Sequence, residues 1–205
     1  MPDFCYEHLA QSRGYNVICG IDEAGRGPWA GPVIAGAVIL DHAKLTYSLI
    51  DSLDDSKKLK PSRREELFEE LKLCACIGIG QSDVIEIDKI NILKATLLAM
   101  TRAVNNLSIS ADFALVDGNA KPELPFQSEC IVRGDSLCLT IAAASIIAKV
   151  TRDRIMVNLA RAYPEYGWEK NVGYGTRQHR KAIETHGVTT EHRRSYAPIK
   201  KFLGL

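Results

Sequence analysis

The sequence has no apolar run long enough to span a membrane, and residues 1–16 lack the basic region and following apolar stretch of a signal peptide. These absences predict a cytoplasmic protein with no membrane partner. Cysteine is also sparse: the six residues are scattered, and the one close pair, Cys74 and Cys76, lacks the spacing of a zinc site. Because cytoplasmic proteins seldom hold disulfides, we expect reduced and mostly buried cysteines.

Net charge is also nearly absent, since the formal value is only +1, but the charges are unevenly distributed. Residues 1–148 hold 14 lysines and arginines against 20 aspartates and glutamates, whereas residues 149–205 hold 12 against 5. Charged helices that happen to cluster late in the chain would explain this pattern. A basic surface for a polyanion would explain it equally well, so charge alone does not decide.

The 205 residues, 46% hydrophobic and 25% charged, are typical of one well-packed globular domain with a small appendage. Short apolar segments bounded by turn residues predict strands at 16–21, 32–40, 74–81, 112–118 and 129–135. Periodic apolar residues predict helices at 61–73, 91–107, 136–164 and 176–187. This alternation indicates an α/β domain over residues 1–162, with helices covering a sheet, and a small helical segment over residues 163–205.

Four acidic residues stand where predicted strands end or a helix begins. Asp22 and Glu23 end the first strand, Asp117 ends the fourth, and Asp135 precedes the long helix. If these strands are neighbours, the acids meet at one sheet edge, where they would repel one another and take up protons. Mg²⁺ or Mn²⁺ would relieve that conflict, and both suit a site of oxygen ligands without histidine or cysteine. Neighbours on a regular strand point to opposite faces, so we expect the first strand to break at Asp22 and Glu23.

Each feature also has an ordinary structural interpretation. Asp135 could cap the long helix, Asp117 could form a turn, and the segment 55–59 could be a solvated loop. The histidines near the basic C-terminal helix are expected at the surface rather than as ligands: His179, His186 and His192.

Several long motifs occur together in one order. They are "GIDEAGRGPWAGPV", "DDSKKLKPSRRE", "VDGN", "GDSLCLTIAAASIIAKVTRD" and "NVGYGTRQHRKAIETHGVTTEHRRSYAP". Over residues 17–198 the chain closely resembles the type 2 ribonucleases H, specifically the bacterial ribonuclease HII family. The resemblance implies a ribonuclease H-like three-layer fold with a mixed central sheet. It also implies an endonuclease that cuts the RNA strand of RNA/DNA hybrids and incises duplex DNA 5′ to an embedded ribonucleotide, leaving 3′-hydroxyl and 5′-phosphate ends.

The resemblance assigns roles to individual residues. The catalytic and metal-binding acids fall on Asp22, Glu23, Asp117 and Asp135, which would hold two Mn²⁺ or Mg²⁺ ions. Gly25, Arg26 and Gly27 match the backbone clamp around the ribonucleotide, and Tyr174 matches a tyrosine that senses the RNA–DNA junction. Further contacts to the substrate, mainly its phosphates, are expected from Ser56, Lys57, Lys149, Arg177, Arg193 and Arg194. The chain departs from the family pattern at Trp29, where an aliphatic residue is common, and at Tyr196, where phenylalanine is usual.

Two other classes of function compete with the nuclease. A nucleic-acid-binding module without catalysis would explain the basic C-terminal region but not four converging acids. A metal-dependent phosphohydrolase of small molecules would explain the acids but not the basic region. We therefore predict a monomeric nuclease that acts on RNA/DNA hybrids and on ribonucleotide-containing duplex DNA.

Overall fold

The computed structural model describes all 205 residues and contains one five-stranded sheet in the order β3-β2-β1-β4-β5. The strands are β1 (Ile18–Ala24), β2 (Val33–Leu40), β3 (Ala75–Ser82), β4 (Phe113–Asp117) and β5 (Gln127–Ile131). β2 pairs antiparallel with both β1 and β3, whereas β4 pairs parallel with both β1 and β5. The predicted mixed sheet is therefore confirmed.

Eight α-helices and two short 3₁₀ helices connect and cover these strands. The α-helices are α1 (Cys5–Ser12), α2 (Tyr47–Ser52), α3 (Pro61–Cys74), α4 (Val84–Asn105), α5 (Leu139–Ala162), α6 (Trp168–Asn171), α7 (Arg177–His186) and α8 (Ala197–Phe202). The 3₁₀ helices are η1 (Gly134–Ser136) and η2 (Pro164–Tyr166). None of the helices combines the length and apolarity needed to cross a bilayer.

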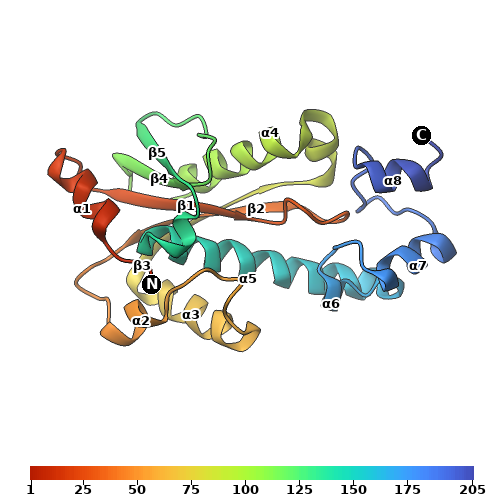
Figure 1. Cartoon of the computed structure of the whole chain (residues 1–205), viewed down its shortest axis with the longest axis horizontal. Coiled ribbons are helices and arrows are strands. Elements are labelled where there is room, and N and C mark those ends of the chain that lie inside the picture. The colour runs from red at the N-terminus through yellow and green to blue at the C-terminus, as the bar shows by residue number, and fades with distance from the viewer.

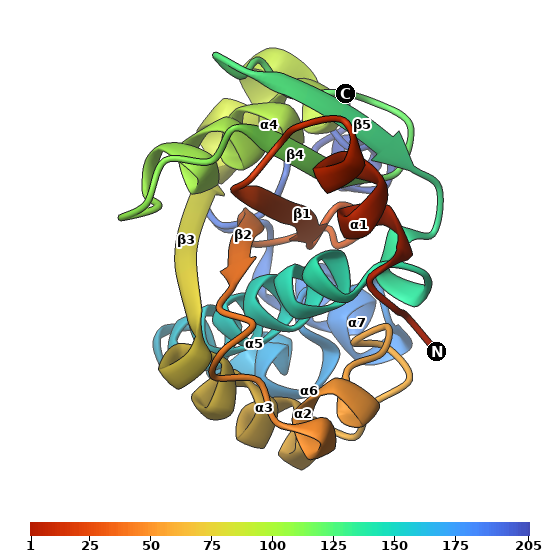
Figure 2. The ribbon, with the colours of Figure 1, turned by 90° about the vertical axis from the view of Figure 1, so that its left-hand side faces the viewer.

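The sheet separates two helical layers, with α4 on one face and α5 on the other, and α3 lies beyond α5 (Figures 1 and 2). Along β2 the side chains alternate, so that Val38 packs toward α3 and α5 while Ala37 packs toward α4. Helix α5 approaches β1 closely at Gly20, where an added Cβ atom would lie 2.2 Å from the carbonyl carbon of Thr140. This close packing brings α5 against the strand that carries Asp22 and Glu23.

The C-terminal helices gather at one end of the molecule, beyond the distal part of α5 (Figure 1). Met156 and Ala160 of α5 share an apolar cluster with Trp168, Ile183 and Ile199 from this region. The cluster fixes the C-terminal segment against the helix that also covers the sheet. The domain boundary at Tyr163 remains a prediction.

The expected break of the first strand at Asp22 and Glu23 is wrong. β1 continues through both residues to Ala24, and the chain turns only at Gly25, whose φ of 100° favours glycine. Pairing explains how both acids still reach one edge: β1 pairs with β4 only as far as Ile21, but with β2 as far as Ala24. Asp22 and Glu23 therefore lie on an overhang of β1 beside the end of β4.

Candidate active site

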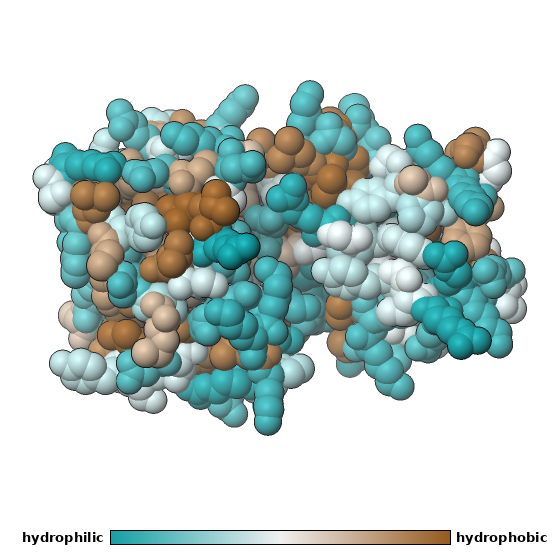
Figure 3. Space-filling view, in the orientation of Figure 1, coloured by the Kyte–Doolittle hydropathy of each residue, from teal (hydrophilic) through white to brown (hydrophobic).

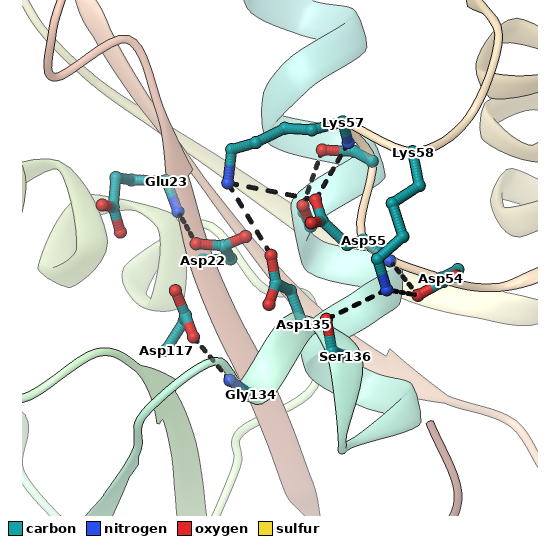
Figure 4. Close-up of polar contacts among 12 residues, drawn as sticks. Asp22, Glu23, Asp54, Asp55, Lys57, Lys58, Asp117, Gly134, Asp135 and Ser136 are labelled. Carbon is teal, nitrogen blue, oxygen red and sulfur yellow. Dashed lines mark hydrogen bonds and ion pairs between the residues drawn. The ribbon is translucent and has the colours of Figure 1, made fainter. Parts of the chain in front are cut away.

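The four predicted acids come together at this edge of the sheet. Figure 4 shows Asp22 between Glu23, Asp117 and Asp135, with Glu23 leaving β1 in the opposite direction. Asp117 is fixed by the backbone N–H of Gly134, which donates to its Oδ1 at 2.7 Å. Asp135 lies in η1, and because Cys138 occupies the N-cap position of α5, the alternative that Asp135 caps this helix is wrong. Acids from three separate parts of the chain thus meet in one place.

Burial and mutual repulsion disfavour the charged forms of these acids. Asp22 is 3% exposed and Asp135 is 6% exposed. Burial first, and then the charges of Glu23 and Asp117, raise the pKa of Asp22 well above its usual value. Burial likewise raises the pKa of Glu23 and of Asp135, the latter with a further contribution from Asp55. The cluster therefore favours any cation that enters it.

Lys57 is the cation that the chain itself brings to the cluster. Its Nζ lies 3.7 Å from Oδ2 of Asp135 and 3.9 Å from Oδ1 of Asp55 (Figure 4). Partial burial would lower the pKa of this ammonium group, but the surrounding carboxylates, chiefly Asp55 and Asp22, raise it. Lys57 therefore stays charged above the acids, where it can also meet a substrate phosphate.

The donor set of the cluster fits a hard divalent cation. All four side chains offer carboxylate oxygens, the ligands that Mg²⁺ and Mn²⁺ prefer, and no histidine or cysteine lies among them. The side chains face one another, but no three histidine, cysteine, aspartate or glutamate side chains form a finished metal-binding group. Like charges hold carboxylates apart until a cation draws them together. The residues thus fit the metal by the chemistry of their donor atoms and by their common place at one sheet edge, and their role as metal ligands remains a prediction.

A pocket of about 450 Å³ opens beside the acids. Seven of its eleven lining residues are among those predicted to bind substrate: Gly25, Arg26, Gly27, Ser56, Lys57, Lys149 and Tyr174. An added Cβ atom at Gly27 would lie 3.3 Å from Cε1 of Tyr174, so the tyrosine ring packs directly against the glycine. Figure 3 shows a hollow between the larger part of the molecule and the C-terminal helices, with hydrophilic side chains mainly on its left-hand side.

Two arginines of this pocket, Arg64 and Arg152, were missed by the sequence analysis. The signal for Arg152 was available, because Ser145, Lys149 and Arg152 follow one stripe of a helix at spacings of four and three. Ser145 also accepts or donates a 2.8 Å hydrogen bond with the buried hydroxyl of Ser56. This stripe of α5 therefore runs from Ser145, which contacts Ser56, to Lys149 and Arg152, which line the pocket.

Three arginines predicted to contact phosphate lie outside the pocket. Arg177 and Arg194 are exposed, and the backbone N–H of Arg194 donates to Asp88. Arg193 is fully buried, and its guanidinium group donates to backbone carbonyls, so the prediction that it meets a phosphate is wrong. The physical reason is that the guanidinium group is saturated inside the protein and has no free N–H for a ligand.

The expected surface position of the histidines is correct for His186 but wrong for His179 and His192, which are both 0% exposed. The N–H of Thr189 donates to Nδ1 of His192, so the proton of neutral His192 lies on Nε2 and faces Nε2 of His179 at 3.0 Å. Trp168 also donates to this Nε2 of His179, and Nδ1–H of His179 therefore donates to the carbonyl of Tyr174. The neutral pair fixes the backbone that carries Tyr174.

Protonation would break the hydrogen bond between His179 and His192, so we predict that the protein loses stability as the pH falls. Burial, and then the charge of His179, lower the pKa of His192 to about 3, far below the ordinary value near 6.5. Since only the unfolded chain takes up this proton between these values, the free energy of unfolding should fall by up to about 1.4 kcal/mol per pH unit as pH drops below 6.5. Urea unfolding of the intact protein and of His192→Gln at pH 7.5, 6 and 5 measures the effect.

In that comparison, His192→Gln should be less stable at pH 7.5 and should approach the intact protein at pH 5. The exposed His186 provides the control, because His186→Gln should keep the pH dependence of the intact protein. Parallel curves for the intact protein and His192→Gln would contradict a neutral buried pair.

Comparison with known proteins gives one consistent family. The family model described as ribonuclease HII matches residues 19–199. The ribonuclease HII of Paramagnetospirillum magneticum is 54% identical over 203 residues, covering 99% of both chains. The ribonuclease HII of Wolbachia pipientis from Culex pipiens is 50% identical and covers 97% of this chain and 98% of that protein.

Solved structures agree with the fold. The ribonuclease H2 of Pyrococcus horikoshii superimposes with a TM-score of 0.75 at 28% identity, over 91% of this chain and 97% of that chain. The structure titled Bst-RNase HIII in complex with Mn²⁺ has a TM-score of 0.74 at 19% identity, over 95% of this chain and 71% of that chain. These likenesses confirm the predicted three-layer arrangement of helices around a mixed sheet.

Proposed function

The chain belongs to the ribonuclease HII family, hydrolases that cut the RNA strand of RNA/DNA hybrids, and on that premise we propose that it also incises duplex DNA 5′ to an embedded ribonucleotide. This family membership sets aside the binding module and the phosphohydrolase of small molecules. Divalent metal use is general in the family. The proposal goes further in assigning the acids, the pocket and a two-metal reaction with 3′-hydroxyl and 5′-phosphate products.

The proposal rests above all on the convergence of the acids beside a basic pocket. Asp22, Glu23, Asp117 and Asp135 would hold the metal ions. Two such ions supply an activated water and stabilise the leaving 3′ oxygen when bound. The pocket next to them is lined by one acid, Glu23, and by five basic side chains: Arg26, Lys57, Arg64, Lys149 and Arg152. Arg26, Lys57 and Lys149 can meet a phosphodiester backbone, whereas Arg64 and Arg152 are buried and donate to backbone carbonyls.

The other residues of the pocket bind and orient the substrate. Gly27 lets the backbone approach the sugar, where a 2′-hydroxyl is the group that distinguishes RNA from DNA. Gly25 makes room for Arg152 instead, since an added Cβ atom would lie 2.0 Å from its Nε. Lys57 stands between Asp135 and the pocket, so it can hold the phosphate next to the scissile bond. Tyr174 is 49% exposed and presents its ring to the sugar on the 3′ side. A cytoplasmic location and a monomeric state remain predictions.

Three duplexes test the function: all-DNA, DNA with one ribonucleotide, and a long RNA/DNA hybrid, each with Mn²⁺, Mg²⁺ or EDTA. We expect both ribonucleotide-containing duplexes to be cut only when metal is present, and the all-DNA duplex to remain intact. Ligation and end-labelling of the products should reveal 3′-hydroxyl and 5′-phosphate ends. Cutting of the all-DNA duplex at a comparable rate would overturn the proposal.

A further inference from the structure

Arg193 is a fully buried cation with no carboxylate partner, although it lies one residue before an exposed arginine. Its five N–H groups all donate: Nε to the carbonyl of Gly31 (3.0 Å), Nη1 to the carbonyl of Arg26 (2.9 Å) and to the hydroxyl of Tyr196 (2.9 Å), and Nη2 to the carbonyls of Gly25 and Pro32. A guanidinium group has five N–H donors, so this set is complete. Burial of a cation is costly, and hydrogen bonds from all five donors offset that cost here.

The hydrogen bonds to the carbonyls of Gly25 and Arg26 determine how two peptide groups are oriented. In a trans peptide the C=O of one residue and the N–H of the next point in opposite directions, and the chain has no cis peptide. Because Arg193 holds the carbonyls of Gly25 and Arg26 toward the interior, the N–H groups of Arg26 and Gly27 point away from it. Neither N–H donates within the chain, and both residues line the pocket beside the acids.

We propose that Arg193 is a positioning residue that turns the peptides 25–26 and 26–27 so that the N–H groups of Arg26 and Gly27 face the pocket as donors to the ribose. This inference rests on the proposed function, because it takes the sugar of the ribonucleotide as the ligand of these donors. The positive charge behind the carbonyls also polarises both peptides and strengthens their N–H groups as donors.

Lysine cannot replace this arginine. An ammonium group offers three donors from one point, whereas the carbonyls of Gly25, Arg26, Gly31 and Pro32 surround a planar fork. Tyr196 has a lesser part, because its hydroxyl donates to the same carbonyl of Arg26 at 2.6 Å but leaves the carbonyl of Gly25 untouched. The pair therefore offers a disruptive variant, Arg193→Lys, and a matched mild one, Tyr196→Phe.

The test measures the Kd for a duplex with one ribonucleotide and for the all-DNA duplex, in EDTA so that neither is cut. We expect the intact protein to prefer the ribonucleotide duplex. Arg193→Lys should lose about five- to tenfold of that preference, the worth of one or two hydrogen bonds, with the Kd for all-DNA duplex within about twofold. Tyr196→Phe leaves both carbonyls bonded to Arg193 and should lose less than about twofold of the preference. Circular dichroism checks that each variant is folded.

Hydrogen exchange in the intact protein provides a measurement that needs no variant. The amides of Arg26 and Gly27 should gain protection on binding the ribonucleotide duplex but not on binding all-DNA duplex. The inference is overturned if folded Arg193→Lys keeps its preference for the ribonucleotide duplex, or if both duplexes protect the amides of Arg26 and Gly27 equally. The proposed function still stands in that case, provided that the intact protein cuts the ribonucleotide-containing duplex. Absence of ribonucleotide-dependent cleavage would instead overturn the proposed function. If Arg193→Lys does not fold, equal protection of the two amides by both duplexes still overturns the inference.

Discussion

Asp22→Asn and Asp117→Asn should each lower turnover of ribonucleotide-containing duplexes by about 10²–10⁴-fold while the protein remains folded. Each substitution removes one negative charge from the proposed metal site, and metal-held charge stabilisation is worth several kcal/mol in the transition state. The shape is nearly unchanged, and the amide oxygen can still accept the hydrogen bonds from Glu23 N–H and Gly134 N–H. Steady-state cleavage measures the loss of turnover, and Mn²⁺ calorimetry measures the accompanying loss of metal affinity.

Stability should respond in the opposite direction to activity. Because burial and neighbouring charges raise the pKa of Asp22, removing its charge relieves repulsion in the metal-free protein. We therefore expect the thermal midpoint of Asp22→Asn in EDTA to equal or exceed that of the intact protein. Asp51→Asn, the same change at an exposed position in α2, should leave turnover and metal binding unaltered. Near-normal turnover in both Asp22→Asn and Asp117→Asn would place the site elsewhere.

The sheet and the acidic edge could be predicted because both depend on local patterns. Apolar segments between turn residues locate all five strands, and an acid at the end of a strand must lie at a sheet edge whatever the packing of the helices. The start of α4 was predicted at Asn91 but lies at Val84, where Asp83 and Glu86 form a capping box. That signal was present in the sequence, and the positive φ at Asn91, 68°, marks a kink inside the helix.

The burial of Arg193, His179 and His192 could not be predicted in this way. An arginine between polar residues is ordinarily exposed, and no local pattern reveals that carbonyls more than 160 positions away surround it. The two histidines are buried for a similar reason, since they face each other between α7 and the segment before α8, against the aromatic rings of Tyr166 and Trp168. Contacts between distant segments determine these positions, so a basic C-terminal region contains structural as well as ligand-binding charges.

Tyr174→Ala should weaken cleavage of a single embedded ribonucleotide more than cleavage of a long hybrid. The ring stands over Gly27 at the pocket, while the backbone is fixed by hydrogen bonds from Tyr174 N–H to Asn171 and from His179 to the Tyr174 carbonyl. Truncation therefore removes the ring without displacing the loop. A flat ring can stack on a deoxyribose but fits a ribose less well, so the loss should fall on substrates whose 3′ neighbour is DNA.

The size of that loss separates recognition from chemistry. Loss of one stacking contact is worth roughly 1–3 kcal/mol, or about five- to 150-fold in rate or affinity. Tyr174 has no carboxylate with which to bind a metal ion. Calorimetry should therefore give the same Mn²⁺ affinity for Tyr174→Ala as for the intact protein, in contrast to Asp22→Asn. Tyr174→Phe distinguishes the ring from its hydroxyl: it keeps most activity if stacking dominates and loses activity if the hydroxyl holds a phosphate. If Tyr174→Ala cuts both substrates as the intact protein does, Tyr174 does not sense the junction, and the pocket must distinguish RNA from DNA through the backbone of residues 25–27 alone.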